Sequence, residues 1–590
     1  MATQSGVFHF SPRPNRAGEI HWREWDDSAF AHAREQDKPI LLAISAVWCH
    51  WCHVMDETSY SDPSIIEVIN ERYVPVRVDN DRRPDVNARY NQGGWPSTAF
   101  LTPDGSLLAG ATYLPPEQMR SALEQVAQFY KTNREEIDRR SADIRSRLAH
   151  HQTPDTEELR EDAVARVLGY VEENYDPEYG GFGTAPKFPM VDVLELLLQE
   201  YRASGEQRWY DMLAHTFLGM SDSGMYDHVE GGFFRYSTTR DWSIPHFEKM
   251  TEDHAGLLRV LAALTRLTRN ERFRSTLISA VSYVRAVLRD PKTQLFAGSQ
   301  DADEEYYALP LEERRERTAP YVDRTSYSNW TAAMAGAFFC VAEALDDDRI
   351  AAEGEATLDA LNERMRDADG LLFHFIEPGG TAQVRGLLTD QAAYLRALLD
   401  AHEFGGGARF LQRARHLAHA IETTFSAQDG GFYDHAGMEN SLGNLTMRDR
   451  PMPDNALLAE SFLRLAVLEE EPRYRELARR ALALYAKTYE RAGMFAAPYA
   501  RALRRYLASP PSVVLVGSGE ETAQLREAAH NLPEALLVVG TIDPADDAML
   551  AKRGFDPQLH PVAYVCREHT CAAPALTAAD LRGAYEALAR

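Results

Sequence analysis

The stretch Lys38–Met55, KPILLAISAVWCHWCHVM, decides how the N-terminal part of the chain is interpreted. Its apolar run Ile40–Ala46 follows a proline and predicts a buried strand. Two cysteines separated by two residues come directly after this run, where a helix is predicted to begin. Strand, C-x-x-C and helix in this order are typical of thioredoxin-like proteins, which present a reactive thiol at this point.

The two cysteines have different predicted roles. We expect Cys49 to be the nucleophile and Cys52 the resolving thiol. The N-terminus of a helix favours an anion and lowers the pKa of a cysteine placed there. His50, between the cysteines, adds positive charge and further favours the thiolate.

Three other interpretations compete for the same residues. Cys49–His53 also has the C-x-x-C-H pattern of c-type haem attachment, although Met1–Gly6 lacks the basic segment and apolar core of a signal peptide. Two cysteines and two histidines are a possible zinc site, but a closed zinc site usually takes its second ligand pair from farther along the chain. The simplest alternative is a thioredoxin fold with idle thiols.

The residues that follow support the redox fold. Asp62–Tyr73 has apolar residues at helical spacing, and Val74–Asp79 alternates like a strand, which together predict a βαβ unit. Pro96 follows two glycines and precedes the apolar run Ser97–Leu101, the position where thioredoxin folds keep a cis-proline opposite the C-x-x-C pair. A turn then leads into Leu107–Tyr113, the expected antiparallel edge.

Length and charge bound the remaining possibilities. A chain of 590 residues is expected to form two to four domains. The net charge of −26 argues against a nucleic-acid or anionic-membrane partner. No apolar run approaches the roughly 18 residues of a membrane span. Five cysteines are too few for a disulfide framework and favour a cytoplasmic location.

The middle of the chain repeats a glycine–aromatic step between amphipathic helical segments. The six steps begin at Gly180, Gly231, Leu295, Gly370, Gly430 and Gly493. Six steps at such intervals predict six helical hairpins, and a closed ring needs no capping ends, unlike an open solenoid. We therefore expect an (α/α)6 toroid.

Polar residues cluster beside these steps and are the candidates for a cleft in the toroid. They are Lys187, Arg235, Trp242, His246, Glu248, Lys249, Asp253, Asp301, Asp303 and Asp323. Aromatic side chains lie between them in the sequence, and aromatic faces with carboxylates and an arginine are typical of sugar sites.

Two kinds of chemistry fit these residues. Two carboxylates can act as acid and base in glycoside hydrolysis, and histidines can move a proton at a sugar carbon, as in epimerases. Structural roles compete with both. Asp301 and Asp303 can cap a helix, Lys249 can pair with Asp253, and His246 can be a core histidine.

The tail changes character again. Ser512–Gly517 and Ala535–Gly540 are two predicted strands with a helical stretch between them, and Val562–Cys566 is a third. This pattern predicts a small α/β domain. Cys566 and Cys571 fit a second redox pair or half a zinc site, and the simplest alternative is a pair of partly buried thiols.

Several motif strings resemble the spermatogenesis-associated protein 20 family. They are His50–Met55, Arg83–Asp85, Gly93–Pro96, Pro186–Pro189, His246–Met250 and Ser299–Asp303. The resemblance implies a thioredoxin-like domain, an (α/α)6 barrel similar to six-hairpin glycosidases and sugar 2-epimerases, and a small C-terminal domain. After Met250 the family usually reads Leu-Tyr-Asp-Asn-Ala, whereas this chain has Thr251–Ala255, which introduces Glu252 and His254.

We therefore expect a multidomain protein with a thioredoxin fold in residues 1–150, an all-α (α/α)6 toroid in 157–505 and an α/β domain in 506–590. The leading functional hypothesis is thiol–disulfide exchange at Cys49 and Cys52, with Pro96 bordering the substrate groove. The alternative is a carbohydrate epimerase, isomerase or hydrolase, and a third hypothesis is a non-catalytic scaffold. Expected partners are a thiol or disulfide substrate and a carbohydrate, without metal or cofactor.

Overall fold

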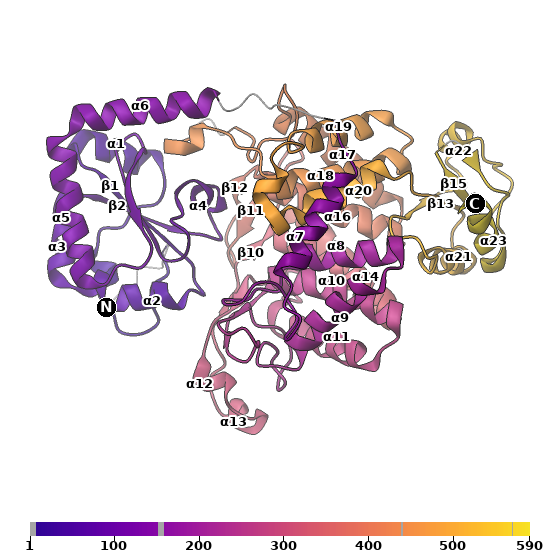
Figure 1. Ribbon diagram of the computed structural model, residues 1–590, viewed down its shortest axis with the longest axis horizontal. Coiled ribbons are helices and arrows are strands. Elements are labelled where there is room, and N and C mark those ends of the chain that lie inside the picture. The colour runs from indigo at the N-terminus through magenta and orange to yellow at the C-terminus, as the bar shows by residue number, and fades with distance from the viewer. Residues whose placement is uncertain (1–7, 151–157, 438–440, 569, 590) are drawn as a thin grey trace. The chain divides into compact units, whose positions relative to one another are not determined.

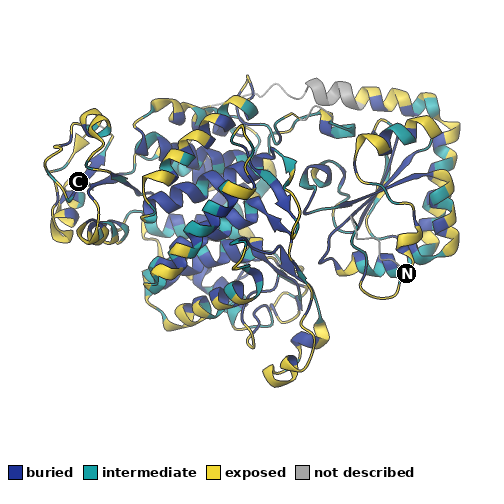
Figure 2. Ribbon diagram, turned by 180° about the vertical axis from the view of Figure 1, so that it is seen from behind, coloured by how far each residue is buried: buried dark blue, intermediate teal, exposed yellow. Residues whose placement is uncertain are grey.

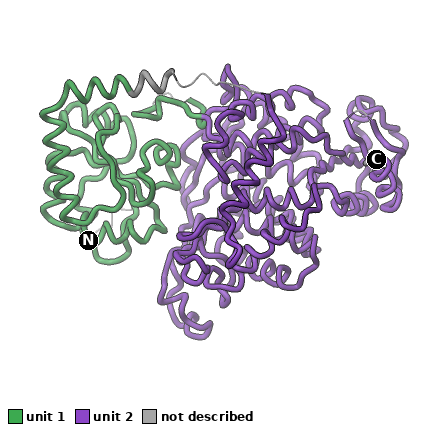
Figure 3. The backbone as a smooth tube through the Cα atoms, in the orientation of Figure 1, with its two compact units in different colours: residues 1–154, 434–449 green, residues 155–433, 450–590 purple. Residues whose placement is uncertain are grey.

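A computed structural model describes residues 8–150, 158–437, 441–568 and 570–589 (Figure 1). The expected linker around residues 150–156 lies almost wholly outside this described part. The chain divides into two compact units, residues 1–154 with 434–449 and residues 155–433 with 450–590 (Figure 3). The protein is multidomain and mostly helical with separate sheets, in agreement with the sequence.

The first unit contains a four-stranded sheet in the order β2-β1-β3-β4. Its strands are β1 Ile40–Ser45, β2 Val74–Asp79, β3 Ser97–Leu101 and β4 Leu107–Ala111. β1 pairs in parallel with β2, Ile40 opposite Val74, and antiparallel with β3. The parallel pair is joined through helices, as parallel strands require.

Both faces of this sheet are covered, which explains why β1 is apolar without interruption. The helices are α1 Asp27–Gln36, α2 His50–Glu57, α3 Pro63–Arg72, α4 Pro84–Tyr90, α5 Pro116–Thr132 and α6 Arg134–His150. Leu41 packs with residues of α2, α3 and α5, whereas Leu42 packs with residues of α1 and α4. Successive side chains of a strand point to opposite faces, so each face has its own core.

The segment 434–449 belongs to this first unit, although the expected boundaries placed it in the helical part. Leu445 is buried in the core beneath α1 and α4. The hydroxyl of Tyr90 accepts the amide N–H of Asn444 at 2.7 Å and donates to the carbonyl of Gly105 at 2.7 Å. This buried side chain therefore fixes a segment that is more than 350 residues away in sequence.

The second unit contains a ring of six inner helices, which are largely buried (Figure 2). They are α8 Val191–Ser204, α10 Thr251–Thr268, α14 Ser328–Leu345, α16 Leu388–Phe404, α18 Met452–Leu468 and α20 Ala497–Leu507. Each of these helices contacts the next one in this order. The last helix, α20, also contacts the first, α8, which closes the ring. The expected domain limit at residue 505 falls inside α20.

An outer helix packs against each inner one. The outer helices are α7 Asp162–Asn174, α9 Gln207–Ser221, α11 Glu271–Tyr283, α15 Asp348–Arg364, α17 Ala408–Phe425 and α19 Pro472–Ala483. Short elements connect the hairpins: β5 Tyr236–Ser237, β6 Pro245–His246, β7 Lys249–Met250, β8 Ser299–Gln300, β9 Val322–Asp323, β10 Ser326–Tyr327, β11 Phe373–Ile376, β12 Gln383–Arg385, α12 Glu304–Tyr307 and α13 Leu311–Arg315.

The glycine–aromatic steps form one recurring loop. Within the described residues, five of them make an antiparallel bridge back to the end of the preceding helical hairpin, as Tyr226 does with Phe233. Glycine is required at Gly232, where φ is +89° and a β-carbon would lie 2.7 Å from the ring of Tyr283. The sixth step lies in the 3-10 helix Tyr489–Ala496.

The tail of the second unit is a small α/β sheet in the order β14-β13-β15-β16. Its elements are β13 Ser512–Val516, α21 Glu520–His530, β14 Val538–Ile542, α22 Asp547–Arg553, β15 Val562–Arg567, β16 Thr570–Cys571 and α23 Ala578–Ala589. β14 contacts α16 and α18 of the ring. Among the described residues, no helix is long and apolar enough to cross a membrane.

Candidate functional site

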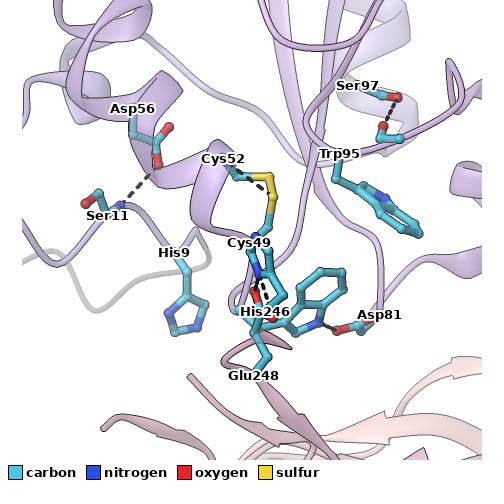
Figure 4. The surroundings of a disulfide bond; sticks show 12 residues. His9, Ser11, Cys49, Cys52, Asp56, Asp81, Trp95, Ser97, His246 and Glu248 are labelled. Carbon is cyan, nitrogen blue, oxygen red and sulfur yellow. Dashed lines mark hydrogen bonds and ion pairs between the residues drawn. A yellow bond between two sulfur atoms is a disulfide. The ribbon is translucent and has the colours of Figure 1, made fainter. Parts of the chain in front are cut away.

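The C-x-x-C pair lies where β1 ends and α2 begins. Cys49 is the N-cap residue of α2, and its Sγ accepts the amide N–H of Cys52 at 3.2 Å. The two cysteines form a disulfide with their Cα atoms 5.2 Å apart (Figure 4). A sulfur in this position meets the unpaired N–H groups and the positive end of the helix dipole, which stabilise a thiolate once the disulfide is reduced.

Two tryptophans lie on the loops beside the disulfide. The rings of Trp48 and Trp95 meet edge to face, with centroids 5.7 Å apart. Nε1 of Trp48 donates to Oδ2 of Asp81 at 2.6 Å (Figure 4). The Trp95-Pro96 bond is cis, as the sequence predicts. Ser97 Oγ donates to the carbonyl of Gly94 at 2.7 Å, which holds the ends of this loop together.

A buried ion pair lies under α2. Arg77 on β2 donates to both carboxylate oxygens of Asp56, at 2.8 and 2.9 Å. Asp56 also accepts the amide N–H of Ser11 at 3.1 Å. Burial lowers the pKa of the nearby His53, so this histidine is held neutral. His50, by contrast, is exposed at the first position of the helix.

The five cysteines differ in solvent exposure and in whether they form a disulfide. Cys49 is 5% exposed and Cys52 is 2% exposed. Cys566 and Cys571 form a second disulfide across the β15–β16 hairpin, so the expectation of unpaired, partly buried thiols was wrong for them. Cys340 remains a free thiol, and burial raises its pKa.

Two of the motif strings meet in the second unit. β7 pairs antiparallel with β8, which places Lys249 opposite Gln300, and β8 pairs with β9. His246–Met250 and Ser299–Asp303 therefore share one small sheet at the start of α10. His246 Nδ1 lies 2.7 Å from Oε1 of Glu248, whose side chain is almost wholly buried. This bond fixes the orientation of the imidazole ring.

An aromatic stack adjoins this histidine. The ring of Tyr236 lies 4.9 Å from that of His246 at 16° and 4.7 Å from that of Phe188 at 24°. Phe188 is 40% exposed. Arg235 precedes Tyr236, and its amide N–H donates to the carbonyl of Glu248 at 2.9 Å. Exposed aromatic faces of this kind suit stacking against a sugar ring.

Carboxylates with raised pKa values complete the cluster. Burial raises the pKa of Asp253 to about 7, and Glu252 beside it adds to the shift. Asp253 Oδ2 is buried and lacks a hydrogen-bond partner within the described residues. Burial, with a contribution from Glu248, also raises the pKa of Asp301 to about 7. Perturbed carboxylates gathered at one place are candidates for acid–base work.

Lys187 and Lys249 do not line a cleft, which corrects the sequence interpretation. Both side chains are fully buried in glycine–aromatic loops. Lys187 Nζ lies 2.7 Å from Asp176 Oδ2, and Lys249 Nζ lies 2.8 Å from Asp227 Oδ2. Lys249 does not pair with Asp253. A buried lysine needs such a carboxylate because an isolated charge in the interior is costly.

Three further residues of the predicted cleft make contacts that stabilise the fold. Trp242 is fully buried, and its Nε1 donates to the carbonyl of Tyr179 at 3.1 Å. Asp303 caps α12 by accepting the amide N–H of Tyr306 at 2.9 Å, which agrees with its structural alternative. Asp323 is buried on β9, where its carboxylate accepts the amide N–H of Thr325 at 3.0 Å.

His254, which departs from the family pattern, holds a loop. Its Nε2 accepts the amide N–H of Phe233 at 2.9 Å, and its Nδ1 lies 2.6 Å from the carbonyl of Met250. Asn455 accepts the amide N–H of Phe432 at 2.7 Å in the same way on α18. His254 therefore accepts the loop N–H that an asparagine side chain accepts in the corresponding loop of α18.

One buried pair was missed in the sequence. His374 Nδ1 lies 2.9 Å from Asp390 Oδ1 at the start of α16, and both side chains are buried. Burial raises the pKa of Asp390. The two residues belong to different elements and to none of the motif strings. The only sequence feature that points to this pair is an amphipathic helical pattern that begins near residue 388 and has a carboxylate, Asp390, in its first turn.

The first unit is a thioredoxin-like domain with a C-x-x-C disulfide, and it is joined to a ring of helical hairpins. The family model Thioredox_DsbH, described as "Protein of unknown function, DUF255", matches residues 13–149. Human spermatogenesis-associated protein 20 is 25% identical over 705 aligned positions, which cover 95% of this chain and 89% of the human protein. The chain is thus similar to spermatogenesis-associated protein 20 over most of its length, as the motif strings indicate.

Other proteins match shorter parts or the fold. Rat spermatogenesis-associated protein 20 is 34% identical over 307 residues, 48% of this chain and 39% of its own length. The thiol:disulfide interchange protein DsbD of Pseudomonas fluorescens is 32% identical over 81 residues, 13% of this chain and 14% of its own length. A cellobiose 2-epimerase from Bacillus thermoamylovorans aligns over 59% of this chain and 98% of its own, with 13% identity and a TM-score of 0.48.

Proposed function

We propose that the N-terminal domain catalyses thiol–disulfide exchange through Cys49 and Cys52. The observation that carries this proposal is the position of Cys49 as the N-cap of α2, bonded to Cys52 one turn later. The match of 81 residues to a protein named for thiol:disulfide interchange gives additional support. We expect the natural partner to be a protein or small-molecule disulfide or dithiol.

The exchange proceeds in two displacements. In the reduced protein, the Cys49 thiolate attacks one sulfur of the substrate disulfide, and the other substrate sulfur leaves as a thiolate. Cys52, after losing its proton, then attacks Sγ of Cys49, which re-forms the internal disulfide and releases the second substrate thiol. The substrate gains two electrons and the protein loses two. The reverse sequence oxidises a dithiol.

The different environments of Cys49 and Cys52 suit them to different roles in the exchange. The N-terminal N–H groups of α2 stabilise negative charge on Cys49, an effect of typically 0.3–1 kcal/mol. Cys52 lies within the helix and has the smaller exposed fraction. We therefore propose that Cys49 meets the substrate first, with Pro96 and Trp95 bordering the groove.

The test is turnover of a model disulfide by the full chain with a fixed supply of dithiothreitol. We expect Cys49→Ser to lower the rate at least 100-fold, because the nucleophile is removed. Cys52→Ser, reduced beforehand and mixed with the model disulfide after dithiothreitol is removed, should react once and stop as a mixed disulfide. Cys340→Ser and Asp301→Ala serve as controls and should keep the parent rate. Equal rates in parent and Cys49→Ser would refute the proposal.

The second unit favours a second candidate function, and we propose that its ring is an (α/α)6 barrel that binds carbohydrate. The observation that favours it is the stack of Phe188, Tyr236 and His246 beside the carboxylates of Asp253 and Asp301. A neutral carboxyl group with a pKa near 7 can donate a proton, and a histidine oriented by Glu248 can accept one.

Binding and turnover of sugars test this candidate separately. We expect Tyr236→Ala to weaken binding of a responsive mono- or disaccharide from a panel at least tenfold, because a stacking face is lost. His246→Asn and Asp253→Asn should abolish any turnover, whereas Cys49→Ser should leave it unchanged. A panel without binding in calorimetry would remove the candidate. The three-part division into 1–150, 157–505 and 506–590, with 434–449 reassigned, remains our proposal for the domains.

A further inference from the structure

A cavity of about 250 Å³ lies in the helical unit, and of the residues discussed so far only the free Cys340 lines it. All six inner helices line it, mostly through their second halves, together with Ala535 from the segment between α21 and β14. On α10 the lining begins at Arg259, six residues or about 9 Å along the helix beyond Asp253, and none of the residues of the candidate sugar site lines the cavity. The cavity is therefore distinct from the candidate sugar site at the start of α10.

The walls of this cavity carry an excess of positive charge. Seven arginines line it against five aspartates and glutamates. Five of the arginines form ion pairs of 2.5–2.8 Å with these carboxylates: Arg259, Arg266, Arg396, Arg464 and Arg501. In a chain of net charge −26, a local excess of arginines over carboxylates is unexpected and needs a physical explanation.

The surplus comes from Arg202 and Arg505. Arg202 donates to the carbonyl of Glu534 at 2.9 Å, and Arg505 donates to the carbonyl of Leu536 at 3.0 Å. Peptide carbonyls orient these guanidinium groups but do not neutralise them. Within the described residues, Arg505 Nε has no hydrogen-bond acceptor and lies 3.8 Å from Oε1 of Glu460.

Electrostatics agrees with this geometry. Burial lowers the pKa of Arg202, and the nearby Arg266 lowers it further. Burial also lowers the pKa of Arg505; Glu460 opposes this shift, and Arg464 adds to it. Each of these arginines therefore repels a neighbour, and a bound anion would relieve both repulsions.

We propose that this cavity binds the phosphate group of a small molecule or inorganic phosphate. A phosphate carries close to two negative charges at neutral pH, which matches the excess of two arginines over the carboxylates that line the cavity. Planar guanidinium forks donate two parallel hydrogen bonds to such an oxyanion. The proposal is independent of the chemistry assigned to Cys49 and to the sugar site.

An entrance to the cavity lies beside Arg202. A second hollow of about 460 Å³ shares Arg202, Ala263 and Arg266 with the cavity and is further lined by residues of the α21–β14 segment, among them His530 and Pro533. The shared residues place Arg202 between the hollow and the cavity. A phosphate entering here meets Arg202 first and Arg505 deeper inside.

A purely structural role is the competing explanation, because both arginines also hold the α21–β14 segment through its carbonyls. The two explanations differ in their dependence on phosphate. Calorimetric titration of the full chain with inorganic phosphate at constant ionic strength should give one saturable site. We expect Arg505→Gln and Arg202→Gln each to weaken it at least tenfold. The matched control is Arg349→Gln, whose side chain is 82% exposed on α15 and should leave binding unchanged.

Thermal unfolding supplies the second readout. Saturating phosphate should raise the melting temperature of the parent and of Arg349→Gln, since a ligand that binds only the folded state stabilises it. At the same phosphate concentration, the melting temperature of Arg505→Gln should rise by clearly less than that of the parent. Tighter binding of glycerol 3-phosphate than of phosphate identifies an organic monoester, and the opposite order identifies the free ion. Absence of saturable binding by either probe, or equal binding in all variants, overturns the proposal.

Discussion

Lys187 and Lys249 make the same contacts in two successive hairpins of the ring. Nζ of Lys187 lies 2.7 Å from Asp176 and 2.8 Å from the carbonyl of Gly180. Nζ of Lys249 lies 2.8 Å from Asp227 and 2.8 Å from the carbonyl of Gly231. Each lysine thus joins a turn aspartate to the glycine that ends the turn. Their presence in motif strings reflects the architecture of the loops.

The first prediction concerns the stability of this arrangement. Asp176 has two cationic partners, the fully buried Lys187 and the half-exposed Arg240. Lys187→Met leaves a buried carboxylate without its inner partner and should lower the free energy of unfolding by about 3 kcal/mol. Arg240→Gln removes only the outer partner and should cost less than about 1 kcal/mol. Urea unfolding of the helical unit measures both, and equal costs would contradict the asymmetry.

The second prediction separates Asp301 from Asp303. The pKa of Asp301 is raised to about 7, so the folded state holds a proton that the unfolded state releases between pH 4 and pH 7. This group therefore lowers stability as pH rises through that range. Asp301→Asn should raise the free energy of unfolding at pH 8 by up to about 4 kcal/mol and have no effect near pH 3.5.

Asp303→Ala provides the contrast, because it removes the cap of α12. It should lower stability by about 1 kcal/mol wherever the carboxylate is ionised. Chemical denaturation at pH 3.5, 6 and 8 distinguishes the two aspartates. A loss of stability in Asp301→Asn at pH 8 would show that Asp301 has a structural role like that of Asp303. A gain would be typical of a residue kept for function at the expense of stability.

Much of the thioredoxin-like sheet was predictable because its signals are local. β1 is an apolar run between a proline and the cysteine pair, and β2 alternates between apolar and other residues. The observed bounds of both strands agree closely with those expected. The packing of Leu445 against this sheet was not predictable. The residues that receive it, among them Tyr90, are more than 350 positions earlier, and no pattern links the two segments.

The candidate site was predictable only in part for a similar reason. His246 and Asp301 were found through their strings, and β7 pairing with β8 brings these strings together. Lysines in the same strings were misplaced because a sequence does not show whether a charge has a buried partner. For Lys249 that partner, Asp227, comes from the preceding turn.

The third prediction concerns His254 as a structural substitute for a carboxamide. His254→Asn should retain the bond to the amide of Phe233, as Asn455 does for Phe432, and change stability at pH 8 by less than about 1 kcal/mol. His254→Leu removes the acceptor from a buried N–H group and should cost about 1–3 kcal/mol. Thermal unfolding of the two variants makes the comparison, and equal losses would refute this role.

The pH dependence of the same residue gives an independent check. Burial lowers the pKa of His254 to about 4, below its ordinary value of 6.5. Between pH 6.5 and 4 the unfolded state therefore binds a proton at His254 that the folded state does not bind. The free energy of unfolding falls as the pH falls through this range. His254→Asn should be less sensitive to acid than the parent over that range. Identical acid unfolding curves would show that another group governs the transition.

The last prediction concerns the redox state of all five cysteines. Air-oxidised protein, denatured without reductant, should present about one thiol per chain, since Cys340 is the free cysteine and the other four are paired. A thiol-counting reagent measures this, and reduction before denaturation should raise the number to five. Cys49→Ser should yield two thiols when oxidised, because Cys52 loses its partner. Peptide mapping that finds Cys49 joined to any cysteine other than Cys52 would contradict the geometry on which the proposed exchange depends.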